Sequence, residues 1–341
     1  MDINKIIDRM TNEEKVGQLF LAHCPLEGAE ELVERLKLGG LLLFARNFES
    51  EDKDSIREKI RLYNSRASIP LLIAADEEGG TVVRISKFPQ YRPEPFKNPK
   101  DIYACGGFEA VREESIEKAR LLLSLGVNYN LAPVCDYTAD EDKYIARRSF
   151  GRSPEECAEF IDTAVSAMVS EGLCVSLKHF PGYGGNADTH KGMAHDGRDI
   201  SEFEGCDLIP FAHGIAAGAQ SVMVAHNIVA CFDGEYPASL SYPVHEYLRK
   251  EMNFDKVIIT DSLTMAAIRD FTGGEDPCVR ALNCGNDMII TSHFENGISA
   301  VLEALKTGEV SEKRLNEALY RVLTMKSELG LLTTVPDYDI L

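Results

Sequence analysis

The chain has 341 residues, of which 44% are hydrophobic and 27% charged, and its formal net charge at pH 7 is -19. This composition is typical of a globular protein with a large core, and it excludes a chain that is mainly disordered. The acidic charge argues against nucleic acids and anionic membranes as partners, because polyanions are bound by clustered lysine and arginine. An uncharged or small substrate is therefore the expected ligand.

The start of the chain, MDINKIIDRMTNEEKVGQLF, lacks the basic segment, apolar stretch and small-residue cleavage site of a secretion signal. No later apolar run approaches the roughly 18 residues of a membrane-spanning helix. The nine cysteines are scattered without CxxC spacing, which favours reduced structural thiols over redox or zinc sites. These features predict a cytoplasmic protein.

A short apolar run followed by a longer amphipathic segment recurs eight times along the chain, after a helix expected over residues 1–15. Each run is nearly continuously apolar, as a strand buried on both faces should be. The runs expected to form strands are 16–24, 38–47, 69–80, 127–136, 174–182, 221–227, 256–262 and 286–293. The expected helices are 29–37, 51–66, 107–125, 153–171, 201–217, 243–252, 275–283, 295–306 and 311–328.

Eight alternations of strand and helix predict an α/β fold of the TIM (β/α)8 barrel type, because right-handed crossovers build a parallel sheet that eight strands can close. We expect a single domain over residues 1–341, with a tail at 330–341. A doubly wound open sheet is the alternative, and it requires a glycine-rich phosphate loop after the first strand. The stretch HCPLEGAEE at 23–31 has no GxGxxG pattern, so the barrel is favoured.

The ends of seven of the eight runs carry polar or ionisable side chains. In such a barrel the loops after the strands converge over one mouth, so these side chains should share a rim. Ordinary strand ends are polar too, but partly buried charges are costly unless they are paired or used. The residues are Arg46 and Asn47, Asp76 with Glu77 and Glu78, Asp136, Lys178 and His179, His226 and Asn227, Asp261, and Ser292 with His293.

Two of these aspartates have more than one interpretation. Asp261, in VIITDSLTM, could cap the following helix or face the barrel mouth as a nucleophile. Asp76, which precedes two glycines, could form a turn after the third strand or lie where the backbone approaches a ligand.

The stretch KHFPGYGGNADTH at 178–190 predicts a glycine-rich, mobile loop that could close over a substrate. Asp188 and His190 are two residues apart, so in an extended segment they point to the same side. A carboxylate beside an imidazole favours the imidazolium and fixes its tautomer, as a general acid near neutral pH requires. A polar surface loop and a metal site are the alternatives, and the metal site would use His179, Asp188, His190, His195 and Asp196. Their spacing fits no established ligand pattern, so neither metal nor cofactor is expected.

Seven motifs together resemble glycoside hydrolase family 3, and within it the single-domain bacterial β-N-acetylglucosaminidases, over residues 11–325. They are DEEGG at 76–80, RSFG at 148–151, KHFPGYG and DTH within 178–190, DLIPF at 207–211, SVMVAHN at 221–227, PASLS at 237–241 and ITDSLTM at 259–265. The resemblance implies that Asp261 is the nucleophile. It also implies that Asp188 and His190 form an unusual acid/base in place of a carboxylic acid.

The resemblance further implies a set of residues that hold sugar hydroxyls, a task that suits charged groups because they bind several hydroxyls and fix the ring. These residues are Asp76, Arg148, Lys178 and His179, and we add Arg46 and His226 as candidate substrate-binding residues. The chain departs from the family pattern at Tyr183, where histidine is usual, and the stretch from there to the aspartate is one residue shorter.

The resemblance and the residues together predict a retaining exo-β-N-acetylglucosaminidase that acts on cell-wall fragments or related oligosaccharides, as in peptidoglycan recycling. The alternatives are a phosphorylase of the same family, a neutral-sugar β-glucosidase and a non-catalytic sugar-binding barrel. A small carbohydrate is the expected partner, with neither nucleic acid nor membrane, and the protein is expected to be a monomer or weak homo-oligomer.

Overall fold

Eight parallel strands form the main sheet of the computed structural model, which describes residues 2–138, 140–184, 192–273 and 276–334. The strands are β1 (Phe20–His23), β2 (Gly40–Leu43), β3 (Leu72–Ala75), β4 (Tyr129–Asn130), β5 (Cys174–Phe180), β7 (Ser221–Val224), β9 (Val257–Thr260) and β10 (Ile289–Thr291). Their order is β10-β1-β2-β3-β4-β5-β7-β9, with parallel pairing throughout. The two outer strands meet where Ile259 bridges Met288. The sheet therefore closes, and the predicted (β/α)8 barrel is confirmed.

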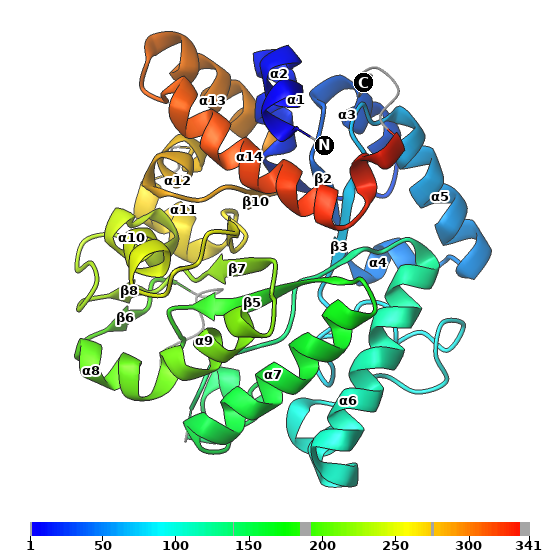
Figure 1. Ribbon diagram of the computed structural model, residues 1–341, viewed down its shortest axis with the longest axis vertical. Coiled ribbons are helices and arrows are strands. Elements are labelled where there is room, and N and C mark those ends of the chain that lie inside the picture. The colour runs from blue at the N-terminus through cyan, green and yellow to red at the C-terminus, as the bar shows by residue number, and fades with distance from the viewer. Residues whose placement is uncertain (1, 139, 185–191, 274–275, 335–341) are drawn as a thin grey trace.

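Helices pack around the outside of the strands, with α5, α6 and α7 along one side and α13 and α14 along another (Figure 1). Each of the nine predicted helical segments contains a helix. The helices are α1 (Ile3–Arg9), α2 (Asn12–Gln18), α3 (Ala29–Leu36), α4 (Ala45–Phe48), α5 (Lys53–Arg66), α6 (Pro99–Leu125), α7 (Pro154–Ser170), α8 (Ile200–Glu202), α9 (Leu208–Ala216), α10 (Tyr242–Lys250), α11 (Ala266–Thr272), α12 (Cys278–Cys284), α13 (Phe294–Thr307) and α14 (Glu312–Glu328).

The ends of α7 show how local sequence sets a helix. The Ser153 hydroxyl accepts a hydrogen bond from the Glu156 N–H, the Glu156 side chain caps in return, and Pro154 occupies the first turn. Gly172, just beyond the helix, has φ 87°, a conformation that favours glycine. The apolar stripe between these signals is buried against the barrel, and removal of that surface from water stabilises the helix.

Several expected boundaries were wrong. The leading segment forms two helices, because Thr11 and Glu14 make a capping box that starts α2. This helix continues to Gln18, so the first strand begins at Phe20 and not at 16. Helix α6 begins at Pro99 and is broken at Gly106 and Gly107, whereas the prediction started at 107.

Three short elements were not predicted. Helices α4 and α11 follow β2 and β9, and α4 contains Arg46 and Asn47, whose side chains both donate to the carbonyl oxygen of Cys24, directly after β1. A second, two-stranded sheet pairs β6 (His195–Asp196) with β8 (Ile228–Val229) beside the barrel. Elements this short have too few residues to show a periodic pattern.

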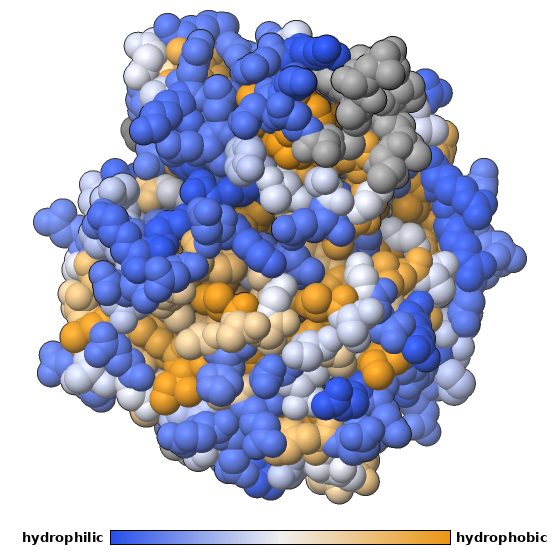
Figure 2. All heavy atoms as spheres, in the orientation of Figure 1, coloured by the Kyte–Doolittle hydropathy of each residue, from blue (hydrophilic) through white to orange (hydrophobic). Residues whose placement is uncertain are grey.

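The core is formed mainly by the apolar side chains of the strands, such as Phe20, Ile73, Val175 and Ile259, all with 0% exposure. Hydrophilic residues cover much of the face seen in Figure 2, and apolar residues gather across its centre and lower part. Among the described residues, no helix combines the length and apolar character needed to cross a membrane.

Candidate active site

Lys178, near the end of β5, lies at the centre of a buried group of charges. Its Nζ is 2.9 Å from Asp76 Oδ1 and 2.6 Å from Glu78 Oε1, and the residue is 2% exposed. Burial on its own would lower the pKa of Lys178, but the two carboxylates outweigh it and hold the pKa above its ordinary value. The lysine is therefore an ammonium ion that ties the turn after β3 to β5.

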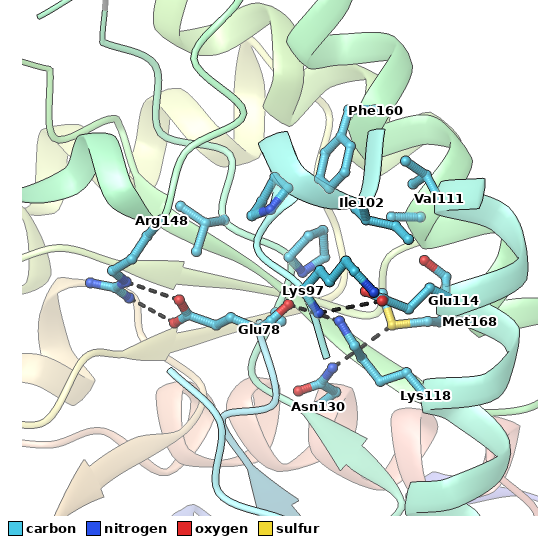
Figure 3. A pocket seen from close by; sticks show the side chains of 16 residues that line it. Glu78, Lys97, Ile102, Val111, Glu114, Lys118, Asn130, Arg148, Phe160 and Met168 are labelled. Carbon is cyan, nitrogen blue, oxygen red and sulfur yellow. Dashed lines mark hydrogen bonds and ion pairs between the residues drawn. The ribbon is translucent and has the colours of Figure 1, made fainter. Parts of the chain in front are cut away.

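Glu78 also forms a bidentate ion pair with Arg148. Arg148 Nε donates to Oε2 at 2.9 Å and Nη2 to Oε1 at 2.7 Å, and Figure 3 shows both contacts. Burial would raise the pKa of Glu78, but Arg148 and Lys178 hold it well below its ordinary range. Behind Glu78 lies a cavity of about 30 Å³, where Lys118 Nζ donates to the Glu78 carbonyl at 2.8 Å (Figure 3). Glu78 is thus fixed at both its side chain and its backbone.

The two glycines after Glu78 make its turn possible. Gly79 has φ 114° and Gly80 has φ 64°, in the region where other residues are strained. A Cβ atom at Gly79 would lie 2.1 Å from the Lys97 carbonyl oxygen, which no side chain can tolerate. The DEEGG motif therefore combines two acids that hold the charges with two glycines that let the chain turn.

Asp136, after β4, fixes the ring of His179. The His179 Nδ1–H donates to Asp136 Oδ2 at 2.6 Å, and the His179 backbone N–H donates to the same oxygen at 3.1 Å. Arg148 Nη2 lies 3.3 Å from His179 Nε2. A guanidinium can only donate, so Nε2 accepts and the imidazole has its proton on Nδ1. The peptide between Lys178 and His179 is cis.

Arg84 completes this charged cluster, which we define as Asp76, Glu78, Asp136, Arg84, Arg148, Lys178 and His179. Arg84 Nη2 lies 3.2 Å from Asp76 Oδ2. Burial would raise the pKa of Asp76, but Lys178 and Arg84 outweigh it and lower the pKa. The cluster contains three carboxylates and three permanent cations, so it is close to neutral and can remain buried.

Asp261, at the end of β9, is different because it has no ion pair among the described residues. Its Oδ1 accepts the Ser262 N–H at 2.7 Å. It lines a cavity of about 510 Å³ together with Asp76 and Arg84. Burial would raise the pKa of Asp261, but the imidazoles of His226 and His179, the Ser262 N–H and the Lys178 ammonium lower it overall. The result is an ionised carboxylate that faces open space.

Asp261 does not cap a helix, although a cap was one of its two predicted interpretations. Helix α11 begins five residues later at Ala266, and its N-cap position is Met265. The other interpretation, in which Asp261 faces the barrel mouth, is the one that the geometry favours.

The remaining predicted site residues lie in different places. His226 is fully buried, with Nδ1 2.8 Å from Ser239 Oγ and Nε2 3.0 Å from the Ser262 carbonyl oxygen. It therefore supports the backbone beside Asp261. Arg46 is exposed, and its guanidinium lies over the Phe44 ring at 4.9 Å, the same ring over which Arg84 lies at 6.0 Å. Asp188 and His190 lie outside the described residues.

The residues on either side of the segment that contains Asp188 and His190 are held by hydrogen bonds and ion pairs. Asp136 Oδ1 accepts the Tyr183 N–H at 2.7 Å, and Asn227 Nδ2 donates to the Gly182 carbonyl at 3.3 Å. On the far side, Arg198 binds Asp196 at 2.8 Å and Asp207 at 2.7 Å. Asp196, which was one of the ligands of the alternative metal site, is thus paired with an arginine.

Sequence reasoning missed two residues of the cavity. Arg84 lies eight positions after Asp76, beyond the DEEGG motif, and it follows the apolar residues Val82 and Val83 in a loop and not at a strand end. His23 is the last residue of β1 and lines the same cavity as Asp261. The expected run continued to Cys24, so the histidine was counted within the strand. A rule that treats any imidazole within two residues of a strand end as a candidate would have found His23.

Comparison with known proteins gives consistent matches over most of the chain. Residues 11–325 match the sequence profile of the glycosyl hydrolase family 3 N terminal domain. A beta-hexosaminidase from Xylella fastidiosa (strain M12) is 36% identical over 299 residues, which cover 86% of each chain. Beta-hexosaminidase A from Pseudoalteromonas piscicida is 30% identical over 334 residues, and the match covers 88% of this chain but only 55% of the relative.

A solved structure shows the same relationship in three dimensions. A glycoside hydrolase family 3 beta-N-acetylglucosaminidase from Paenibacillus sp. str. FPU-7 superimposes with a TM-score of 0.87 at 30% identity. The match covers 94% of this chain and 63% of that one. The present chain thus spans somewhat more than half of some relatives and most of others.

Proposed function

The chain belongs to glycosyl hydrolase family 3, and from this premise we propose that it is a retaining exo-β-N-acetylglucosaminidase. The observation that carries the proposal is Asp261, an ionised carboxylate without an ion pair among the described residues, directed at a cavity of about 510 Å³. Paired carboxylates hold structure together, whereas one left free beside open space can attack a substrate carbon. The name of the similar beta-N-acetylglucosaminidase from Paenibacillus sp. str. FPU-7 supports N-acetylglucosamine as the sugar that is removed.

In the proposed reaction, an Asp261 oxygen attacks the anomeric carbon while the bond from that carbon to the departing oxygen breaks. His190, charged and oriented by Asp188, gives its proton to the departing oxygen. Water then attacks the glycosyl-enzyme ester, His190 takes the proton from that water, and Asp261 leaves as a carboxylate. Because each of the two displacements inverts the anomeric carbon, the product retains the β configuration.

The charged cluster is proposed to hold the hydroxyls of the terminal sugar through Asp76, Arg148, Lys178 and His179. Their positions are fixed by one another before any sugar arrives, so little reorganisation accompanies binding. Arg46, exposed on α4, is proposed for the outer part of the substrate. His226 is proposed to act on the sugar indirectly, by holding the backbone next to Asp261.

We propose cell-wall fragments or related oligosaccharides as substrates and a cytoplasmic location. The nine cysteines are all free thiols, as a reducing compartment permits. The acidic charge of the chain fits a small carbohydrate as partner. Product analysis on an anhydromuropeptide and on chitobiose distinguishes a wall fragment from a chitin oligosaccharide.

The nucleophile is tested with Asp261→Asn and with Asp270→Asn as the matched control, because Asp270 is an exposed aspartate nine residues away on α11. We expect Asp261→Asn to lower kcat on an aryl β-N-acetylglucosaminide by at least about a thousand-fold. The control should keep its activity, and both variants should unfold at the same urea concentration as the wild type. Near-normal turnover by folded Asp261→Asn would overturn the assignment.

Two further assays separate the alternatives. An aryl β-glucoside measured beside the aryl β-N-acetylglucosaminide decides between the two sugars. Initial rates with and without inorganic phosphate, with a search for sugar 1-phosphate, test phosphorolysis. A histidine acid/base would not repel an incoming phosphate dianion as a carboxylate would, so the comparison with and without phosphate is needed.

A further inference from the structure

The polar groups of Ser262, the residue after Asp261, are all in contact with protein partners. The N–H donates to Asp261 Oδ1 at 2.7 Å, and the carbonyl oxygen lies 3.0 Å from His226 Nε2. The hydroxyl lies 2.9 Å from Thr264 Oγ1 and 3.2 Å from His23 Nε2. The N–H that holds the carboxylate of Asp261 therefore belongs to a residue whose side chain is held by Thr264 and His23.

His23 is itself held firmly in the barrel wall. It ends β1, which pairs with β10 on one side and with β2 on the other, where His23 is in register with Leu42. Its ring packs edge-on against Phe44, with the centroids 4.8 Å apart and the planes at 67°. Such a pair has a preferred geometry, so the direction of Nε2 toward Ser262 is fixed.

The surroundings of His23 keep its ring neutral at neutral pH. Burial and then Arg46 lower the pKa of His23, Asp76 and Asp261 raise it, His293 lowers it, and the net value is about 4. Nδ1 has no hydrogen-bond partner among the described residues, and the ring lines the cavity with Asp261. A neutral imidazole of fixed orientation is suited to hold a hydroxyl without adding a charge beside the carboxylate.

We propose that His23 is a positioning residue for Asp261: its Nε2 fixes the hydroxyl of Ser262, and Ser262 in turn fixes the oxygen of Asp261 that it binds. The inference rests on the proposed function, because it takes Asp261 as the nucleophile. Attack on an anomeric carbon needs a close, aligned oxygen, and a displacement of about 1 Å can lower a rate by about a hundred-fold. Loss of the His23 contact should therefore change kcat more than KM.

Three substitutions separate the two ring nitrogens. The amide nitrogen of glutamine reaches the place of Nε2, that of asparagine reaches the place of Nδ1, and phenylalanine keeps a ring without either. We expect His23→Phe and His23→Asn to lower kcat roughly ten-fold, the worth of one hydrogen bond, with KM changed less than about two-fold. His23→Gln should keep kcat within about two-fold of wild type. The control is His213→Asn, which removes an exposed imidazole on α9, away from His23 in the sequence and in no proposed role, and should change neither constant.

The rates are measured on whichever aryl glycoside the wild type cleaves fastest. If that substrate is a glucoside, the proposed sugar specificity fails, while the ratios between variants still test His23. Equal kcat in all variants overturns the inference. Two other results also overturn it. One is a kcat near the wild-type value for His23→Asn together with a lowered kcat for His23→Gln, and the other is a raised KM at constant kcat. Both would mean that His23 contacts the sugar through Nδ1. Urea unfolding midpoints show that each variant is folded.

Discussion

Lys326 is a fully buried lysine on α14 with no carboxylate partner among the residues that the structure describes. Its Nζ donates to Gln18 Oε1 at 2.6 Å, and the residue is 0% exposed. Burial lowers the pKa of Lys326 to about 7. An ammonium ion in this position is poorly solvated, so the folded state is destabilised whenever the lysine is charged.

The size of this effect follows from the pKa. A fall of about 3.5 from the ordinary value of 10.5 corresponds to roughly 5 kcal/mol of stability lost while Lys326 is charged. The unfolded chain keeps this proton up to about pH 10.5, whereas the folded chain releases it near pH 7. The free energy of unfolding therefore rises with pH between these values, and the penalty is fully present below pH 7.

Replacement by methionine removes the charge and keeps the approximate shape. It also leaves Gln18 Oε1 without a donor, which costs about 1–3 kcal/mol. We expect Lys326→Met to be more stable than wild type by about 2–4 kcal/mol at pH 6. At pH 10 the gain should disappear, because most of the wild-type lysine is then neutral in the folded state.

Urea unfolding at pH 6 and at pH 10 measures this difference through the transition midpoints. Lys313→Met is the matched control, since Lys313 lies on the same helix with its side chain 86% exposed. The control should shift neither midpoint appreciably. The reasoning is refuted if Lys326→Met is no more stable than wild type at pH 6, or if its gain is the same at both pH values.

Three further substitutions probe the network around the barrel. Glu78→Gln leaves two buried cations undercompensated, so we expect a loss of about 3–5 kcal/mol of stability in urea unfolding, and an unchanged midpoint would contradict this. Asp136→Asn replaces one accepting oxygen by an NH2 group, which would face the N–H donors of His179 or Tyr183. We expect kcat/KM to fall about 10- to 100-fold, and an unchanged kcat/KM would contradict this. Asp287→Asn weakens contacts with three arginines before β10, at the barrel end away from Asp261. It should lower stability by about 3 kcal/mol or more but leave the kcat/KM of the folded protein intact.

The order of strands and helices could be predicted because each element carries its own periodic or apolar signal. All eight apolar runs contain a barrel strand, and Ser153 and Gly172 mark the ends of α7 as predicted. The predicted boundaries were wrong where a local capping interaction or a break in the helix sets the end of an element. The capping box at Thr11 extended α2 into the expected first strand, and the break at Gly107 hid the first turns of α6.

The site was predictable to the extent that its residues end strands. Lys178, His179 and Asp136 lie toward the ends of predicted apolar runs, and the fold brings them together. The pairing pattern was not predictable, because ion pairs between β3, β5 and the segment of Arg148 depend on distances across the barrel. That Asp261, unlike Asp76 and Glu78, has no ion pair among the described residues became visible only once the pairs of those two acids were known.

One carboxylate joins the charged cluster to the start of the 178–190 stretch. Asp136 accepts the ring and backbone N–H groups of His179 with one oxygen and the Tyr183 N–H with the other. The Tyr183 side chain is buried in a small apolar group and lies edge-on to His179 at 5.5 Å. Tyr183, which stands where the family usually has histidine, therefore packs against apolar side chains at the start of the 178–190 stretch. Because the same oxygen pair positions the His179 ring and the start of this stretch, a change at Asp136 should disturb sugar binding and proton delivery together.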